Sequence, residues 1–403
     1  MSTYRDLVRA TTPGYLVLAF LARLPLAMAP LATLVLVVAS TGSYAVAGLA
    51  NAVQGLASMV GGPVLGALAD RHGHRTVTVA ATAVAAAALA GLVPAARAGT
   101  GAVLAASALA GLARPQIGAL VRVQWSRLAR AHDRALLPTA LSYEAAVDET
   151  TFVAGPALVG ILTLIPVAGA APVAAAAILL LAATLPFALV HTSSTTAPSA
   201  EPDTALPGLP RPELAGMFAA MAIMGVVFGA VQTAVTAFAN TTGRPWAAGL
   251  IYAELGVGSA LAGTATAWLP RNFTVPARYA CSAGALLLGT LLLLTVGSLA
   301  TMLAAVAVLS VTVAPYMITL YGLTDQLAPA SRANAAMTVM TAGGPAGVAL
   351  GTAVAGHLAD HHGYRGAFAV APPAAAAALT LALASLRRLR GLGGGTGEVP
   401  IYR

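Results

Sequence analysis

Charged side chains are scarce in this chain. They make up 8% of its 403 residues, whereas 58% of the residues are hydrophobic and the mean hydropathy is +0.83. A soluble domain carries about a quarter charged residues, so this composition excludes an ordinary soluble protein and predicts an integral membrane protein. The single cysteine, Cys281, has no partner for an intrachain disulfide and cannot form a thiolate metal site alone.

Lysine is absent, so all 21 basic residues are arginine. Together with the high alanine content, this is typical of the coding bias of a high-GC bacterial genome, and we predict a protein of the bacterial cytoplasmic membrane. The formal net charge is +8. A nucleic-acid site requires a continuous basic patch, however, and these arginines are scattered between hydrophobic runs, so we predict no nucleic-acid partner.

Twelve apolar runs of membrane-spanning length follow one another along the chain. The polar stretch 191–212, rich in Thr, Ser and Pro, is predicted to be a linker between residues 1–190 and 213–403. The predicted fold is all-α, with twelve transmembrane helices in two six-helix halves. The helices are predicted at 14–40, 44–69, 76–98, 101–121, 138–165 and 169–190, and at 213–240, 246–270, 275–296, 299–323, 333–357 and 366–386.

Arginines gather in the loops on one side of this predicted topology. The other side carries only Arg97, Arg244 and Arg365. Because cytoplasmic loops carry an excess of positive charge, both termini and the linker are predicted to be cytoplasmic, as an even number of helices requires. The arginine-rich side comprises Arg5, Arg9, Arg71, Arg75, Arg122, Arg127, Arg130, Arg134, Arg271, Arg278, Arg387, Arg388 and Arg390.

The two predicted halves repeat one another in sequence. Ala47-Gly48-Leu49 recurs as Ala248-Gly249-Leu250, and the glycines and serine that follow (Gly55, Ser58, Gly62) recur in register as Gly256, Ser259 and Gly263. Gly155-Pro156 likewise recurs as Gly344-Pro345. Parallel repeats of this kind imply a pseudo-twofold axis along the membrane normal, with a cavity between the halves near the midplane.

A polar decapeptide, Gly66-Ala-Leu-Ala-Asp-Arg-His-Gly-His-Arg75, interrupts the apolar region between two predicted helices. It resembles the motif G-x-L-A-D-R-x-G-R-R of the major facilitator superfamily, with matches at Gly66, Leu68, Ala69, Asp70, Arg71, Gly73 and Arg75. His74 departs from it, replacing a fixed cation by a titratable one. The resemblance implies a conformational latch at the cytoplasmic face, with Asp70 opposing a helix N-terminus or an arginine of the other half.

Two further segments strengthen the resemblance. Gly155-Pro156 and Gly160 partly match the antiporter motif G-P-x-x-G-G, and Arg114-Pro-Gln-Ile-Gly118 partly matches R-x-x-Q-G, whose arginine is associated with proton transfer. The resemblance implies a secondary transporter that works by alternating access, and we predict a proton-coupled exporter of a small, partly apolar molecule. A sugar or organic-acid porter of the same fold is the alternative within transport.

A membrane-bound enzyme or sensor is the alternative from another class. It would need a catalytic constellation or an appended soluble domain, and the sequence supplies neither. No P-loop or zinc-hydrolase signature is present, which argues against a nucleotide-driven pump. We therefore predict no enzymatic activity and no cofactor. The predicted partners are a small-molecule substrate, protons and the lipid bilayer, for a chain that works as a monomer.

Six charged residues fall inside predicted helices, where an unpaired charge costs several kcal/mol. Glu144 and Asp148 lie four residues apart on one helical face, so mutual repulsion should leave one of them readily protonated. The proton-coupling residues are predicted to be Glu144, Asp148, Glu149, Arg23 and Arg114, and the substrate cavity to include Arg23, Tyr143, Tyr252 and Glu254. The alternative for the carboxyl cluster is a static charge network that locks neighbouring helices.

Three histidines cluster near the end of the helix predicted at 333–357. His357 and His361 share a helical spacing that metal ligands could use, with Asp360 and His362 beside them. Gly363 and the polar context instead predict an outer loop here. We therefore predict no metal site.

Overall fold

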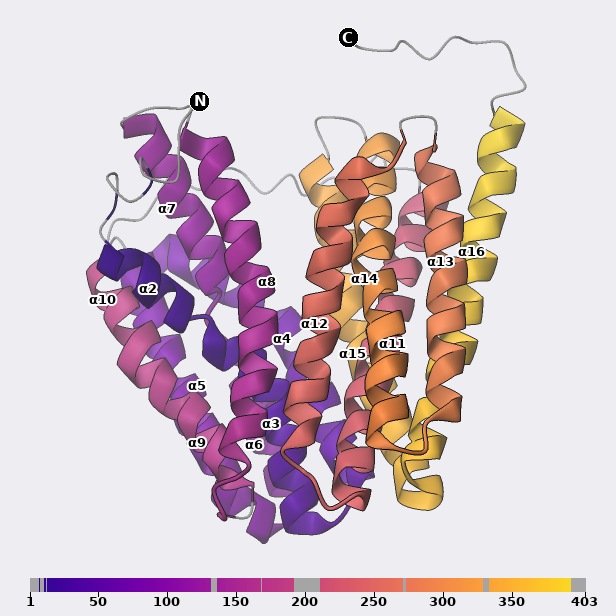
Figure 1. The fold of residues 1–403 in the computed structure, drawn as a ribbon. Helices are drawn as coiled ribbons and strands as arrows, with labels where there is room; N and C mark the ends of the chain where they lie inside the picture. Colours follow the sequence, from indigo (N-terminus) through magenta and orange to yellow (C-terminus); the bar gives the residue numbers. More distant parts are fainter. Residues whose placement is uncertain are drawn as a thin grey trace.

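The computed structural model describes residues 7, 11, 13–131, 136–167, 169–191, 211–270, 273–328 and 333–392. Within them the chain forms two helical bundles that lie side by side (Figure 1). The first contains α2 (Pro13–Leu21), α3 (Leu24–Thr41), α4 (Tyr44–His72), α5 (His74–Ala98), α6 (Thr100–Leu112), α7 (Ile117–Ala131), α8 (Leu136–Leu162), α9 (Ala170–Leu179), the π-helical turn η1 (Leu180–Thr184) and α10 (Leu185–His191).

The second bundle begins at Arg211, within the predicted linker 191–212, of which residues 192–210 lie outside the described part of the chain. It contains α11 (Arg211–Thr241), α12 (Ala247–Ala265), η2 (Thr266–Trp268), α13 (Val275–Leu292), η3 (Leu293–Thr295), α14 (Leu299–Leu327), α15 (Ala333–Phe368) and α16 (Ala371–Leu392). Each bundle has its own buried apolar core. A smaller core around Trp125 and Phe187 fills the end of the first bundle where α7 ends and α8 begins.

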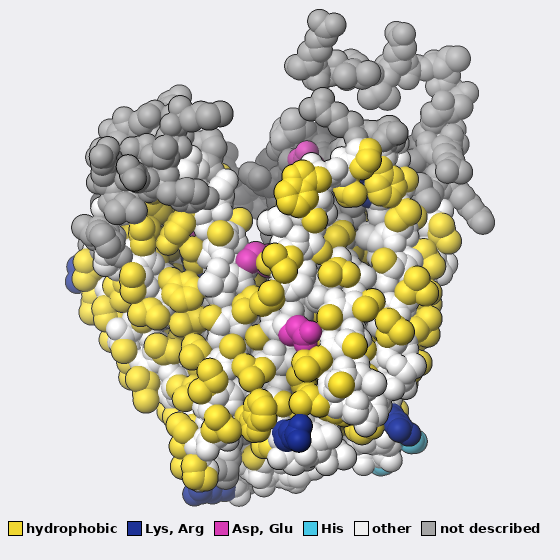
Figure 2. Space-filling model, viewed as in Figure 1, with side chains coloured by type: hydrophobic (Ala, Val, Ile, Leu, Met, Phe, Trp, Pro, Cys, Tyr) yellow, Lys and Arg dark blue, Asp and Glu magenta, His cyan; other side chains and the backbone are white. Residues whose placement is uncertain are grey.

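Ten helices among the described residues are long and apolar enough to cross a membrane. Two of the predicted twelve are not among them: α12, in which Tyr252, Glu254 and several glycines lower the mean hydropathy, and α16, of which Ala371–Ser385 is a shorter apolar helix. The chain is thus a multi-pass membrane protein by its helices, while the count of twelve stays a prediction. Hydrophobic side chains cover most of the face shown in Figure 2.

The spans predicted at 14–40, 101–121 and 169–190 are confirmed as candidate membrane spans, but the helix is interrupted within each of them. Arg23 lies between α2 and α3 just before Pro25, and Arg114-Pro115 separates α6 from α7. Proline lacks the backbone N–H that would continue a helix and disfavours helical geometry in the preceding residue. The third interruption is the π-helical turn η1, two residues before Pro186. All three interruptions belong to the first bundle.

The helix predicted to end at His357 continues to Phe368. It is interrupted only at Gly363, whose φ of 63° lies in the left-handed region that glycine adopts without strain. The three histidines near its end are therefore helical, and the prediction of a loop there is wrong. Polar composition near a helix end did not distinguish a loop from a helix that extends past the apolar region.

The bundles contact each other mainly through two helix pairs, α4 with α15 and α8 with α12. At these contacts the backbones are too close for side chains. A Cβ atom on Gly48 of α4 would collide with the Thr352 carbonyl of α15, and one on Gly249 of α12 would collide with the Pro156 carbonyl of α8. Gly48 and Gly249 are the repeated glycines of the sequence, so the internal repeat corresponds to two equivalent contacts between the bundles.

Glycine should also be required where α15 packs against α11 inside the second bundle, as it is at the contacts between the bundles. A Cβ on Gly351 would collide with the backbone of Val226 in α11. Gly351→Ala should therefore cost about 1–3 kcal/mol and lower the thermal midpoint of the purified protein in detergent. Gly91→Ala in α5, where nothing lies within 4 Å of the new Cβ, is the matched control and should leave the midpoint unchanged or raise it. Equal midpoints for the two variants would contradict this packing.

Candidate functional site

A cavity of about 440 Å³ lies between the two bundles. The first bundle contributes residues of α3, α4, α8 and the α6–α7 break, and the second contributes α11, α12, α14 and α15. Positions of the sequence repeat line it from both sides: Gly55, Ser58 and Pro156 from the first bundle, and Gly256, Ser259 and Pro345 from the second. The predicted cavity between two repeated halves is therefore present.

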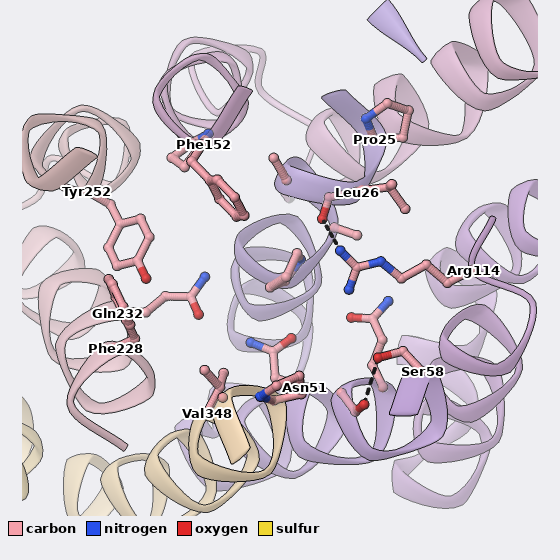
Figure 3. Close-up of a pocket in the computed structure, with 18 of the residues that line it drawn as sticks. Pro25, Leu26, Asn51, Ser58, Arg114, Phe152, Phe228, Gln232, Tyr252 and Val348 are labelled. Carbon is pink, nitrogen blue, oxygen red and sulfur yellow. Dashed lines mark hydrogen bonds between the residues drawn. The ribbon is translucent and has the colours of Figure 1, made fainter. Parts of the chain in front are cut away.

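Polar groups in the cavity are mostly neutral. Asn51 and Gln54 lie one turn apart on α4, and Gln232 faces them from α11 (Figure 3). Asn51 is 4% exposed and Gln54 9%, yet neither atom of the Asn51 amide, nor the Gln54 Oε1, has a hydrogen-bond partner among the described residues. Buried polar atoms are nearly always hydrogen-bonded, so these amide atoms are available to water or to a bound molecule.

Aromatic side chains form another part of the wall. Phe152 reaches the cavity from α8, Phe228 from α11 and Tyr252 from α12 (Figure 3). Most other lining residues are Ala, Leu, Pro, Val and Met. The space therefore combines apolar walls with a few amide groups, the composition expected of a small-molecule site.

Arg114 lines the cavity at the break between α6 and α7. One of its guanidinium nitrogens donates to the Leu26 carbonyl of α3 at 3.4 Å (Figure 3). That carbonyl is free because the residue four positions later in the helix is Pro30, which has no N–H. Two prolines in different helices thus place this cation, and Arg114 has no ion pair with a carboxylate among the described residues.

The three predicted coupling carboxyls on α8 have different surroundings. Glu144 is 1% exposed and forms an ion pair with Arg23, which is 3% exposed, and also accepts a hydrogen bond from Trp125 Nε1 at 2.8 Å. Asp148 pairs with Arg122 of α7 and lies 3.8 Å from Arg23 Nε. The repulsion that the sequence predicts between Glu144 and Asp148 is therefore compensated by two arginines.

Glu149, in contrast, lines the cavity and has no ion pair within the described residues. Next to Asp148 in sequence, it projects from another face of α8, as the turn of about 100° per residue predicts. The cavity therefore contains one cation, Arg114, and one anion, Glu149, neither of them neutralised by the other.

Arg23 owes its buried position to the break between α2 and α3. The Ala22 carbonyl beside it accepts a hydrogen bond from Thr184 Oγ1 at 3.0 Å, and Thr184 ends the π-helical turn η1. The interrupted helices thus satisfy each other's backbone groups, as an apolar environment requires. Arg23 and Glu144 link α3 to α8 outside the cavity.

Two other predicted cavity residues also lie elsewhere. The Tyr143 ring packs edge-on against Trp125, with ring centroids 6.4 Å apart. Glu254 lies on the face of α12 that carries the exposed side chains Leu250, Val257 and Leu261, and not among the cavity residues. Of the four predicted cavity residues, Tyr252 alone lines the cavity.

The predicted gating segments lie in different parts of the molecule, Gly66–Arg75 at the turn between two helices and Gly155-Pro156 beside the cavity. Gly66–Arg75 forms the turn between α4 and α5, where the Gly73 N–H donates to the Ala69 carbonyl with φ at 87°. Asp70 lies 3.8 Å from His74, and both are accessible at this end. Gly155 packs without room for a side chain against Ala27 of α3, and the Pro156 carbonyl contacts α12.

The end at which α3 meets α4 and α11 meets α12 is closed by hydrogen bonds between the bundles; we name it the closed end. Asp360 of α15 accepts from Ser43 Oγ at 2.7 Å and from the backbone N–H groups of Tyr44 and Ala45, at 2.6 and 3.1 Å. Asn240 of α11 donates to the Tyr44 hydroxyl at 2.9 Å. A carboxylate of one bundle thus caps a helix N-terminus of the other.

The opposite end, where α7 ends and α8 begins, is the open end. Figure 2 shows the molecular surface hollowed between the two bundles there. Sequence reasoning found the polar groups of the open end but missed Asp360 as a gate residue. No local pattern marks it, because its partners are 315 to 317 residues away in the chain.

This fold defines a multi-pass membrane protein with a cavity between two helical bundles. Residues 277–398 match the sequence model of the Major Facilitator Superfamily. No curated protein matches the chain in sequence. This match supports the resemblance seen in the sequence over the last third of the chain.

Several solved transporter structures are similar in fold. The crystal structure of nucleoside transporter NupG has a TM-score of 0.72 and 18% identity, covering 93% of this chain and 98% of that chain. A bacterial homologue of the iron transporter ferroportin in the inward-facing state has a TM-score of 0.66 and 16% identity, covering 93% and 99%. A POT family transporter in complex with a thioalcohol-conjugated peptide has 0.64 and 14%, covering 93% and 95%. These likenesses show the fold.

Because Asp360 caps α4 at the closed end, we expect its substitution to shift the protein toward opening of that end. Asp360→Asn removes the charge that faces the N-terminus of α4, which at this exposed position should cost the closed arrangement about 0.5–1 kcal/mol, or about a two- to fivefold shift toward opening. Spin labels replacing Ser40 and Arg244, in a Cys281→Ser background, should then report a larger fraction of long distances. Asp325→Asn, at the open end, is the control. Identical distributions for both variants would show that the cap does not hold this end closed.

Proposed function

We propose that the chain is a proton-coupled secondary transporter that exports a small, partly apolar molecule by alternating access. The observation that carries this proposal is Glu149, a carboxyl that lines the cavity without an ion pair among the described residues, while its neighbours Glu144 and Asp148 are both paired. A carboxyl in a membrane-embedded cavity that lacks a fixed partner can be neutralised by a proton or by substrate. Competition between the two would couple their movements.

The proposed orientation has the open end facing the cytoplasm of a bacterial cell. Support comes from the arginines: Arg71 and Arg75 lie at the turn between α4 and α5 at the open end, whereas Arg97 and Arg244 belong to the closed end. Positive charge favours the cytoplasmic side. The closed end would then face outside, so the arrangement seen is inward-facing, with Glu149 able to release its proton to the cytoplasm as substrate binds.

Transport then requires the contacts at the closed end to break and the open end to close. The glycine contacts of α4 with α15 and of α8 with α12 give two smooth surfaces about which the bundles can rock. Glu149 lies on α8, one of these helices. The protonation state of Glu149 would therefore be coupled to the relative position of the two bundles through one helix, α8.

A porter for organic acids is the second candidate, favoured by Arg114. This guanidinium lines the cavity with only a neutral carbonyl as its hydrogen-bond partner. It could hold a carboxylate, with the proton on Glu149 moving in the same direction as the substrate. The direction of pH-driven flux in liposomes distinguishes export from this alternative.

We expect substitutions of the α8 carboxyls to separate proton coupling of transport from the stability of the fold. Glu149→Gln should retain exchange of substrate down its own gradient but lower pH-driven accumulation by about tenfold or more. The amide cannot carry a proton, and one proton moving down a gradient of one pH unit is worth about a factor of ten. The folded stability of this variant should be unchanged. Both activities are measurable in proteoliposomes with a labelled substrate from a diverse panel.

Glu144→Gln is the matched comparison on the same helix. It leaves the Arg23 guanidinium buried without its partner, which should destabilise the fold by about 3–5 kcal/mol. Asp148→Asn, partly exposed, should have a smaller effect of the same kind. If Glu149→Gln responds to a pH gradient like the wild type, the coupling carboxyl is not Glu149 and the proposed mechanism is wrong.

We also propose that Asp70 forms a latch when the open end closes. In the present arrangement its partner is His74, 3.8 Å away on α5, which leaves it accessible to the other bundle. Asp70→Asn should enrich the inward-facing population and lower turnover about two- to fivefold with the fold retained. Asp325→Asn serves as the control. Spin-label distances across the open end that match the wild type, in a folded variant, would refute the latch.

A further inference from the structure

Asn51 is a cavity residue whose buried carboxamide has no hydrogen-bond partner on either atom among the described residues. Its side chain is 4% exposed and lines the cavity, and both its Nδ2 and Oδ1 are without a partner among the described residues. A carboxamide presents an N–H donor and a C=O acceptor side by side. Only a ligand group that offers an acceptor beside a donor, such as another amide edge, satisfies both atoms at once.

Two more carboxamides surround the same space. Gln54, one turn along α4, has an unpartnered Oε1 that requires a further N–H or O–H donor. Gln232, 5% exposed, points into the cavity from α11 (Figure 3). These amides belong to both bundles, so a molecule bonded to them would connect the bundles across the cavity.

The remaining walls restrict the ligand's shape. Phe152 from α8 and Phe228 from α11 present aromatic rings to the same space as the amides (Figure 3). Most of the other lining residues are aliphatic. A polyol would place several hydroxyls against these apolar groups, which leaves them without hydrogen bonds and is unfavourable. A flat molecule with an apolar face and a polar edge fits both sets of residues.

We infer that the cavity binds a small planar molecule with an amide-like edge, an N–H beside a C=O, which pairs with Asn51 while its faces lie against the aromatic side chains. This inference deepens the proposed transport function and rests on it for its biological meaning. No net charge on the ligand is required, because Arg114 and Glu149 of opposite sign line the same cavity.

Binding of paired ligands to the full-length protein in detergent tests the inference. The probes are isocarbostyril, a flat bicyclic lactam, its N-methyl derivative, which lacks the N–H donor, and glucose as a polyol. The lactam should bind at least about tenfold more tightly than the N-methyl compound, because methylation leaves the Asn51 acceptor unsatisfied. Glucose should bind more weakly than the lactam. Isothermal titration calorimetry measures all three without a proton gradient.

Protein variants assign the preference to Asn51. Asn51→Leu should reduce the difference between lactam and N-methyl lactam to about threefold or less, since neither can then form the paired bonds. Gln124→Leu removes a carboxamide of α7 that does not line the cavity and should keep the wild-type preference. The ligand comparison on the wild-type protein stands even if the Asn51 variant does not fold.

The outcomes separate this inference from the proposed function. Equal affinity for the two lactams, tighter binding of glucose, or no lactam binding would overturn the ligand class, whatever pH-driven flux shows. A lactam preference that disappears in Asn51→Leu supports it, even if Glu149→Gln transports like the wild type and the coupling proposal falls.

Discussion

The buried ion pair between Arg23 and Glu144 is the constraint on which the first bundle depends. Neither charge could remain in an apolar bundle alone, because an unpaired buried ion costs several kcal/mol. The pair joins α3 to α8, and Trp125 of α7 completes it with a hydrogen bond to Glu144. Glu149 and Arg114, which line the cavity, are not part of this network and have no ion pair among the described residues.

The two bundles divide the chemical tasks between them. All three interruptions described above, at Arg23, at Arg114-Pro115 and at η1, lie in the first bundle, together with the paired charges of α8. The second bundle contributes apolar and amide groups to the cavity, and Asp360 to the closed end. Because the charged groups share one bundle, their network can move as a unit while contacts to the other bundle form and break.

Sequence reasoning recovered what depends on local pattern or on repetition. The apolar runs placed the helices, the repeated glycines Gly48 and Gly249 mark contacts between the bundles, and the three predicted carboxyls do share one helix, α8. It could not separate Glu144 from Glu149, because the partners that differ, Arg23 and Trp125, come from other helices. Asn51 and Gln54 were missed for a related reason: a neutral amide in a helix has no significance until its partners are known to be absent.

Proline links the backbone of the first bundle to the chemistry of the cavity. Pro30 leaves the Leu26 carbonyl without a helical partner, and Arg114, exposed by the break before Pro115, donates to it. Pro30 alone would leave the Leu26 carbonyl unsatisfied in an apolar environment, and the break at Arg114-Pro115 brings a cation to it. Because a 3.4 Å bond to a carbonyl does not neutralise that cation, Arg114 remains available to balance Glu149 or a bound anion. In the proposed cycle, the net charge of the cavity would change by one unit when Glu149 gains or loses a proton, and this is the electrostatic difference that the proposed alternating access would use.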